Sequence, residues 1–231
     1  MENLDYIFFI NLEKRPDRKK HFLEQCTKHG LPFEKIMRFD AIDGTTYGFE
    51  ERHYKMFEDA IYKHQPFANK IMGNQLSHYH ILKLMVKEGY QNILVLQDDA
   101  IFRPNFLGYL DNIMKNIPQD AQIVNLGLHK FASEEKFVPW DFSDTTEDEC
   151  IVEKPVNEFV CYWNRKVNPC SLAYIVTNRG AKKLVEYFDK VGFKEATDHN
   201  FNNYLINKRV FYGSTRVLAT TNMKFDSDIF L

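Results

Sequence analysis

The clearest buried strand of the chain lies in ILVLQDD, residues 93–99. Its first four residues are apolar, which is typical of a strand that is covered on both faces of a sheet. A second run of this kind, YIFFI at residues 6–10, precedes a segment that contains Pro16 and an apolar stripe ending at Gly30. Proline in the first turn and glycine after the last turn predict a helix there. The chain therefore opens with a buried strand followed by a helix.

The same patterns recur along the chain. Further strands are predicted at residues 35–39, 122–126, 172–176 and 210–215, and further helices at 76–87, 104–116, 178–188 and from Asp198. Residues 47–67 mix charged and aromatic side chains, which indicates surface helix and loop. Residues 133–149 are acidic and predict a long loop over one face, because core-like segments resume after them. Alternating strands and helices predict one α/β domain, residues 1–231, with a mostly parallel sheet flanked by helices.

The composition fits a globular protein: the chain has 231 residues, of which 44% are hydrophobic and 15% aromatic. The net charge of -2, with both signs interspersed, argues against nucleic acid as a partner. No apolar run is long enough to span a membrane, and nothing basic precedes the first one as in a signal peptide. We therefore expect a cytoplasmic protein, in a bacterial cytosol or, if virus-encoded, in host cytoplasm or a virion.

The four cysteines, Cys26, Cys150, Cys161 and Cys170, contain no Cys-x-x-Cys pair. Reduced thiols are the expectation for a chain without a targeting segment. The alternative is a structural zinc site formed by the last three cysteines. The oligomeric state has no signature in the sequence.

Asp98 and Asp99 follow directly on the buried strand at residues 93–96. In an open α/β sheet, ligands bind at the carboxyl ends of the strands. Two carboxylates held close together repel each other unless a cation neutralises them. Their hard oxygen atoms suit Mn²⁺ or Mg²⁺, with diphosphate oxygens and water completing the coordination. The alternative interpretation is a helix cap beside one solvated acid.

Other polar residues stand at predicted helix starts. Arg15 and Arg18 lie three positions apart after the first strand, where they suit a diphosphate; the alternative is a solvated basic helix start. Asp198 fits the N-cap of its helix, and His78 fits a satisfied structural histidine. The sequence contains no Gly-x-Gly-x-x-Gly, P-loop or Gly-x-Ser-x-Gly motif, which argues against dehydrogenases, ATPases and common serine hydrolases.

Several stretches, taken in order, resemble glycosyltransferase family 25, which includes bacterial lipopolysaccharide and lipooligosaccharide galactosyltransferases and the catalytic domains of collagen galactosyltransferases. The matching stretches are FINL at residues 9–12 with Arg15 and Arg18, DAIDG at 40–44, GNQLSH at 73–78, LVLQDDA at 94–100, AYIVT at 173–177 with Gly180 and Ala181, and Asp198. Together they cover nearly the whole chain. Each stretch alone is weak, whereas the set in this order is fairly specific.

The resemblance implies a GT-A-like fold, a divalent metal, a UDP-sugar donor and inversion at the anomeric carbon. Carried over by position, Asp99 is the main metal ligand and Asp98 its neighbour, while Asp198 is the general base, with Asp43 and Asp226 in reserve. The residues expected to contact the donor nucleotide are Asn11, Leu12, Arg15, Arg18, Ala41, Asp43, Ser77, Gln97 and Asp98.

The acidic C-terminal stretch at residues 224–229 is similar to the closing segment of the family. A tail that folds back would add Asp226 or Asp228 as a metal ligand, and Asp228 is the residue we select. The alternative is a solvated chain end. Trp140, Tyr162 and Trp163 are candidates for the acceptor side, because aromatic faces stack on sugar rings.

The chain departs from the family at Gln97, where the family usually has glutamate. The amide removes one negative charge from the predicted site. The predicted function is transfer of galactose or glucose from a UDP-sugar to a saccharide or to hydroxylysine of a collagen-like protein. The first alternative is a catalytically silent nucleotide-sugar-binding protein of the same fold. The second is a metal-dependent phosphohydrolase, which would release inorganic phosphate without a sugar acceptor.

Overall fold

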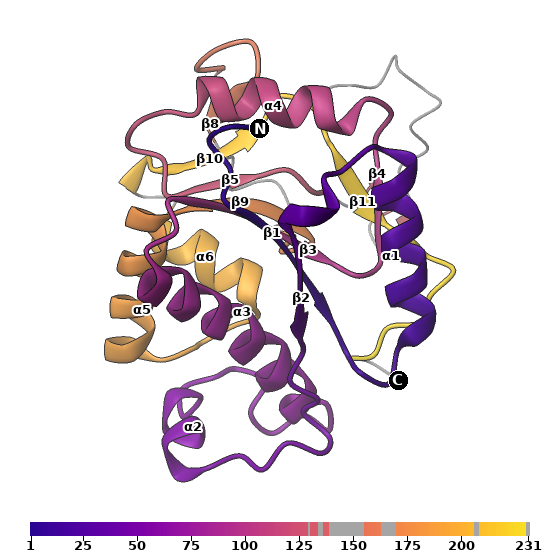
Figure 1. Ribbon diagram of the computed structural model, residues 1–231. Coiled ribbons are helices and arrows are strands. Elements are labelled where there is room, and N and C mark those ends of the chain that lie inside the picture. Colours follow the sequence, from indigo (N-terminus) through magenta and orange to yellow (C-terminus); the bar gives the residue numbers. More distant parts are fainter. Residues whose placement is uncertain (129, 134–135, 139–154, 163–169, 206–207, 230–231) are drawn as a thin grey trace.

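A computed structural model describes residues 1–128, 130–133, 136–138, 155–162, 170–205 and 208–229, in which strands and helices alternate (Figure 1). The helices are α1 (Pro16–Lys28), α2 (Glu51–Met56), α3 (Ala68–Glu88), α4 (Phe106–Asn116), α5 (Asn178–Val191) and α6 (Thr197–Leu205), with one 3₁₀ turn, η1 (Phe33–Lys35). The strands are β1 (Tyr6–Asn11), β2 (Ile36–Asp40), β3 (Asn92–Gln97), β4 (Ala100–Phe102), β5 (Ile123–Asn125), β6 (Lys130–Ser133), β7 (Lys136–Val138), β8 (Val160–Tyr162), β9 (Ala173–Thr177), β10 (Phe211–Ser214) and β11 (Ala219–Thr221).

A seven-stranded sheet with the order β2-β1-β3-β9-β5-β10-β8 forms the centre of the molecule. β2, β1, β3, β5 and β10 run in one direction, whereas β9 and β8 run in the opposite direction. The α/β sheet flanked by helices is therefore confirmed. The two reversed strands were not foreseen, because an apolar run indicates a buried strand but does not indicate its direction. That direction depends on where the connecting chain enters the sheet.

Apolar side chains leave both faces of the sheet and form a core on each side. Phe8 and Ile10 of β1 point to the face covered by α3, α5 and α6. Ile7 and Phe9 point to the opposite face, which α1 and α4 cover. This alternation with a period of two is the reason that the strands read as continuous apolar runs. Helices consequently cover both faces of the sheet (Figure 1).

Some boundaries differ from the sequence prediction. Helix α3 begins at Ala68, eight positions before the expected start, because its first two turns bury Ile71 and Met72 although the residues around them are polar. The short strands β4, β8 and β11 were not predicted, since three residues carry too little pattern. Most of the predicted acidic loop at residues 133–149 lies outside the described residues, as do Trp140, Trp163 and Cys150. The single-domain assignment stays a prediction.

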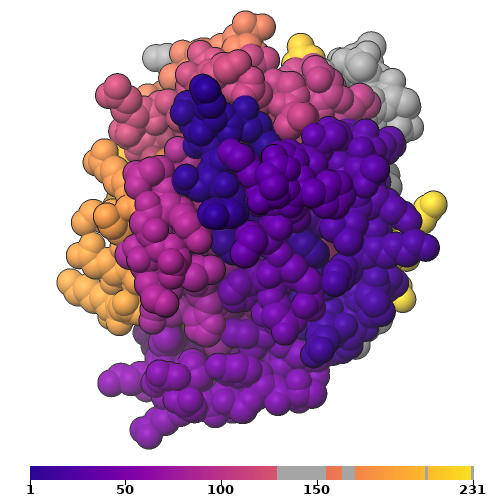
Figure 2. Space-filling view, viewed as in Figure 1, coloured from indigo at the N-terminus to yellow at the C-terminus, as the bar shows by residue number. Residues whose placement is uncertain are grey.

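The segment between β2 and α3 closes one end of the molecule, the lower end in the space-filling view (Figure 2). Its loop at residues 41–44 packs directly on α3. A Cβ atom on Gly73 would lie 2.4 Å from the carbonyl oxygen of Ile42, and one on Gly44 would overlap the backbone of Asn69. Both positions therefore require glycine. The DAIDG and GNQLSH motifs, which are separate in the sequence, are therefore in direct backbone contact in the fold.

Candidate functional site

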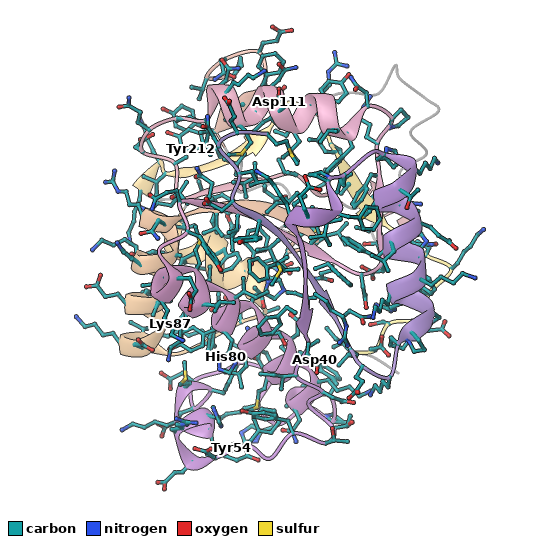
Figure 3. All side chains as sticks on the ribbon, in the orientation of Figure 1. Asp40, Tyr54, His80, Lys87, Asp111 and Tyr212 are labelled. Atoms are coloured by element: carbon teal, nitrogen blue, oxygen red, sulfur yellow. The ribbon has the colours of Figure 1, made fainter. Side chains whose placement is uncertain are left out.

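Three parallel strands, β1, β2 and β3, end side by side at one edge of the sheet. Ile10 pairs with Gln97 across β1 and β3, and Asn11 pairs with Asp40 across β1 and β2. The buried side-chain amide of Asn11 donates a hydrogen bond of 2.6 Å to Oδ2 of Asp98, just beyond the end of β3. Figure 3 labels Asp40 at this edge. Strand pairing therefore gathers polar residues that are distant in the sequence.

A cavity of about 400 Å³ opens at the same edge. Its walls come from the turn after β1, the loop after β2, helix α3, the end of β3 and the chain that follows β11. The predicted nucleotide and metal residues that line it are Leu12, Arg18, Ala41, Asp43, Ser77, Gln97, Asp98, Asp99 and Asp228. Asn11, Arg15 and Asp198 are not part of the lining. Most of the candidate site residues thus meet at one cavity.

The acidic pair is buried and shares one arginine. Nη1 of Arg18 lies 3.2 Å from Oδ1 of Asp98 and 3.4 Å from Oδ2 of Asp99. Burial raises the pKa of both carboxyl groups, to about 6 for Asp99, although the charge of Arg18 lowers each of them. Asp98 also raises the pKa of Asp99 by repulsion between the two carboxylates. The negative charge of the pair is therefore only partly compensated, even with Arg18 in contact.

Asp99 also has an unused ligand atom. Its Oδ1 is buried and has no hydrogen-bond partner among the residues that the structure describes, although its backbone carbonyl oxygen accepts a hydrogen bond from the N–H of Asn222. An unpaired, buried carboxylate oxygen beside a second carboxylate suits a hard divalent cation. Among the described residues, no group of three His, Cys, Asp or Glu side chains could hold a metal unaided. The donor set therefore fits Mn²⁺ or Mg²⁺ only together with oxygen atoms from a bound ligand or water.

The chain after β11 folds back onto the start of α1, which corresponds to the first of the two alternatives left open for the C-terminal stretch. Nη1 of Arg15 lies 2.5 Å from Oδ2 of Asp228, and Nη2 of Arg18 lies 3.3 Å from the same oxygen. Nη2 of Arg18 also donates to the carbonyl oxygen of Asp226. In Figure 1 this yellow segment passes beside the start of α1. Asp228, predicted as a metal ligand, is thus ion-paired with the two arginines.

The loop after β2 forms another wall of the cavity. The N–H of Ala41 donates to the carbonyl oxygen of Asn11, and the buried hydroxyl of Ser77 accepts a hydrogen bond of 2.9 Å from the N–H of Ile42. Nζ of Lys14 lies 2.6 Å from the carboxylate of Asp43. Burial alone would raise the pKa of Asp43. Hydrogen bonds from Lys14 and Thr45 outweigh this effect and lower that pKa. Ser77 therefore fixes the loop in addition to lining the cavity.

Gln97 has a partner that explains an amide at this position. Its Nε2 donates to the hydroxyl oxygen of Ser171 at 3.2 Å and to the carbonyl oxygen of Ser171 at 3.4 Å. Ser171 lies just before β9, which pairs with β3. A glutamate carboxylate has no N–H to give to a carbonyl oxygen. Gln97 therefore ties the start of β9 to the floor of the cavity.

Asp198, the predicted base, lies in the first turn of α6 and is half-buried. Its Oδ1 accepts a hydrogen bond from the N–H of His199. The adjacent Thr197 donates its hydroxyl at 3.2 Å to Oδ1 of Asn74, and Asn74 lines the cavity. Burial raises the pKa of Asp198, against the lowering effect of His199. Asn74 of α3 therefore contacts both the cavity and the turn that carries Asp198.

Asp198 and Asp99 also share an electrostatic neighbour, Cys170. Burial first, and then the charges of Asp198 and Asp99, raise the pKa of the Cys170 thiol. Both carboxylates therefore lie within electrostatic range of one buried thiol near the start of β9. His78, in contrast, is a core residue: its Nδ1 lies 2.8 Å from the hydroxyl of Tyr174. The position is structural, but only one ring nitrogen of His78 is satisfied, because its buried Nε2 has no hydrogen-bond partner within the described part of the chain.

Several residues of the cavity were missed by the sequence analysis. They are Ile10, Lys14, Ile42, Gly44, Lys70, Asn74, Thr221, Met223, Phe225, Ser227 and Ile229. Lys14 and Ile42 adjoin predicted site residues, so their motifs were the available signal. Phe225 lies in the stretch at residues 224–229 that resembles the family's closing segment, but its contact with the arginines depends on where the last strand delivers the chain. No helix among the described residues is long and apolar enough to cross a membrane.

Comparisons with known proteins agree with these motifs. The family model described as glycosyltransferase family 25 (LPS biosynthesis protein) matches residues 4–201. A glycosyltransferase 25 family member of Drosophila pseudoobscura pseudoobscura is 29% identical over 79% of this chain and 27% of its own length. Procollagen galactosyltransferase 1 of Danio rerio is 29% identical over 78% of this chain and 28% of its own. A probable inactive glycosyltransferase 25 family member 3 of Bos taurus is 26% identical over the same shares, 78% and 28%.

The chain matches only 27% to 28% of the length of these relatives. A solved structure, that of a glycosyltransferase involved in the glycosylation of the major capsid of PBCV-1, covers 96% of this chain and 94% of its own with a TM-score of 0.43 and 9% identity. The substrates in the names of these relatives are therefore stated of those proteins and not of this chain.

Proposed function

The chain belongs to glycosyltransferase family 25, and on that premise we propose that it transfers galactose or glucose from a UDP-sugar to an acceptor hydroxyl, with inversion. The observation that carries this proposal is the cavity in which two buried carboxylates, Asp98 and Asp99, meet the guanidinium group of Arg18. The carboxylates suit a divalent cation and the arginine suits a diphosphate. A GT-A-like form of the fold, implied by the resemblance, is part of the same proposal.

The donor nucleotide fills the cavity between α1 and the loop after β2. Arg15 and Arg18 hold its diphosphate at the start of α1, where the positive end of the helix dipole favours anions. Leu12, Ala41 and Ile42 line the cavity and supply apolar surface for the nucleoside. This arrangement resembles the general form of ligand sites, in which apolar walls carry a few convergent polar groups.

Arg18 has two tasks in this proposal. In the structure its guanidinium group contacts Asp98 and Asp99 and offsets part of their negative charge. With donor bound, the same group faces the diphosphate and stabilises the negative charge that develops on the departing nucleotide. Asp98 and Asp99 would hold Mn²⁺ or Mg²⁺, which would supply further positive charge beside that leaving group. Asn11 keeps the Asp98 carboxylate in place through its 2.6 Å hydrogen bond.

Asp198 is the proposed general base, which takes the proton of the acceptor hydroxyl. A carboxylate with a raised pKa is the stronger base, and burial raises that of Asp198. Asp43 is less suited, because its hydrogen bonds with Lys14 and Thr45 lower its pKa and occupy its oxygens. Asp226 is exposed, and its backbone oxygen is already bound to Arg18. The structure therefore favours Asp198 over both reserves.

The acceptor is proposed to be a saccharide or hydroxylysine in a collagen-like protein. The Danio rerio relative named procollagen galactosyltransferase supports the second choice, while the family description as an LPS biosynthesis protein supports the first. Among the predicted aromatic residues of the acceptor side, only Tyr162 is described, and its ring stacks on Tyr212 at 5.1 Å. Tyr162 is not part of the cavity lining.

A catalytically silent nucleotide-sugar-binding protein is the second candidate. Gln97 favours it, because the amide leaves the acidic motif with one negative charge fewer, and so does the probable inactive relative from Bos taurus. The hydrogen bond from Gln97 to Ser171 favours the enzyme instead, because it explains the amide by a structural contact. A two-metal phosphohydrolase finds no support in the described residues, which hold no group of three potential ligands.

The test is release of UDP from a panel of UDP-sugars incubated with the protein and Mn²⁺, with GDP-mannose as the control donor. We expect release from UDP-galactose or UDP-glucose and none after EDTA is added, because the buried carboxylates need a divalent cation to receive the diphosphate. Binding of UDP without release from any donor, with saccharide or hydroxylysine peptide acceptors present, would establish the silent protein. Absence of both binding and release would overturn both candidates.

Replacing Asp228 by Asn is expected to tighten UDP binding in the presence of EDTA by about 3- to 5-fold. The Asp228 carboxylate competes with the diphosphate for Arg15 and Arg18, and partly exposed ion pairs contribute up to about 1 kcal/mol. Isothermal titration calorimetry measures the affinity, and Asp226→Asn is the matched control, because only the backbone of Asp226 contacts Arg18. Weaker UDP binding that appears only with Mn²⁺ would instead make Asp228 a metal ligand.

A further inference from the structure

The ring of Phe225 lies against Arg18, which lines the cavity, and against Arg15 beside it. The guanidinium carbon of Arg15 is 5.7 Å from the ring centroid, and that of Arg18 is 5.5 Å from it. His21, one turn further along α1, meets the same ring in a T-shaped contact with a centroid distance of 5.2 Å. Phe225 therefore packs on helix α1 and on the residue before it.

This contact stands out in its segment. Lys224, Asp226 and Ser227, the neighbours of Phe225, are exposed, whereas Phe225 itself is half-buried and lines the cavity. Its backbone N–H donates to the carbonyl oxygen of Asn222, and the N–H of Asn222 donates to that of Asp99. The ring is thus held at the cavity by a turn that begins on the acidic pair.

Two like charges do not stay side by side without a partner. Arg15 and Arg18 both reach the same Oδ2 atom of Asp228, so their guanidinium groups converge. An aromatic face next to a guanidinium group attracts it and limits the directions it can take. Asp228 already shows that an anion fits where the two groups converge. Once a diphosphate replaces that carboxylate, the ring is the part of the tail that still holds both arginines.

We propose that Phe225 is a positioning residue that aims Arg15 and Arg18 at the diphosphate of the donor. The inference rests on the proposed function, since it takes the diphosphate as the ligand. It adds that the C-terminal segment at residues 222–229 contributes to the donor site through the ring of Phe225 and not through a carboxylate. The ring acts through the arginines and not by stacking on the base. Its loss therefore changes recognition of the phosphates and leaves recognition of the nucleoside intact.

Calorimetry with UDP and with inorganic pyrophosphate, and ligand-observed NMR with uridine, test this assignment. Phe225→Leu is expected to weaken binding of UDP and of pyrophosphate by about 5- to 10-fold, as the loss of two cation–π contacts implies. Uridine binding is expected to stay within 2-fold, roughly the precision of such a comparison. Phe225→Tyr, which keeps the aromatic face, is expected to restore wild-type affinity. Phe33→Leu, at an exposed phenylalanine of η1, is the matched control.

Each other outcome is decisive. Equal loss for UDP and uridine would show that Phe225 supports the cavity in general or stacks on the base, and would overturn the assignment. Unchanged UDP binding in Phe225→Leu would overturn it as well, while leaving the proposed function intact. If the protein binds pyrophosphate in a Phe225-dependent manner but does not bind UDP, the result would support the assignment and contradict the UDP-sugar donor. Absence of binding to both anions in the wild-type protein would overturn both.

Discussion

Replacing Asp99 by Asn is expected to lower UDP release by about 10²- to 10³-fold while raising the melting temperature. The activity falls because the amide removes the buried negative charge that is proposed to hold the divalent cation. Loss of one electrostatic group of this kind lowers the rate by about this factor. The stability rises because the wild-type carboxylate is buried beside Asp98, and each raises the free energy of the other. About 1 kcal/mol of relief corresponds to roughly 2–4 °C for a chain of this length.

Opposite changes in activity and stability separate a functional charge from a structural one. The matched control is Asp40→Asn, at the same edge of the sheet but exposed and paired with Arg38 at 2.8 Å. That variant is expected to keep activity within 2-fold, and to change stability by less than roughly 0.5 kcal/mol, as exposed substitutions usually do. Calorimetric melting and UDP release measure both properties. Retained activity in Asp99→Asn would remove the acidic pair from the proposed chemistry.

The order of elements followed from the sequence because each buried strand is a short, continuous apolar run. β1, β3 and β9 appear where such runs occur, and Pro16 and Gly30 bracket α1. The direction of β9 did not follow, since residues 173–177 pack equally well between two sheet neighbours in either direction. The early start of α3 did not follow either, because burial of its first two turns depends on a loop that crosses them.

The site was predictable to the extent that it lies at strand ends. Asn11 and Asp98 terminate neighbouring parallel strands, so their meeting is a consequence of the register. The tail is different, because Asp228 could be assigned a role only by resemblance. Its pairing with Arg15, 213 positions away in the chain, depends on how β11 delivers the last residues. Contacts of that kind carry no local pattern, which is why Phe225 was missed.

Replacing Asp198 by Asn is expected to lower turnover by about 10²- to 10⁴-fold, the usual contribution of a general base. The amide keeps the volume and accepts the hydrogen bond from the N–H of His199, but it cannot take a proton from the acceptor hydroxyl. Because Asp198 is not part of the cavity lining, UDP affinity and the donor KM are expected to stay within about 2-fold. A fall in kcat at constant KM is the signature of an interaction made only in the transition state.

The neighbouring carboxylate provides the control for this last prediction. Glu195 stands three positions before Asp198, and its side chain contacts His199 and Asn203 rather than the cavity. Glu195→Gln is therefore expected to retain wild-type turnover, and Asp43→Asn to raise the donor KM through its loop with at most a small change in kcat. Steady-state kinetics on the best donor and acceptor distinguish the three variants. If turnover survives in Asp198→Asn and collapses in Asp43→Asn, the base lies across the cavity, on the loop after β2.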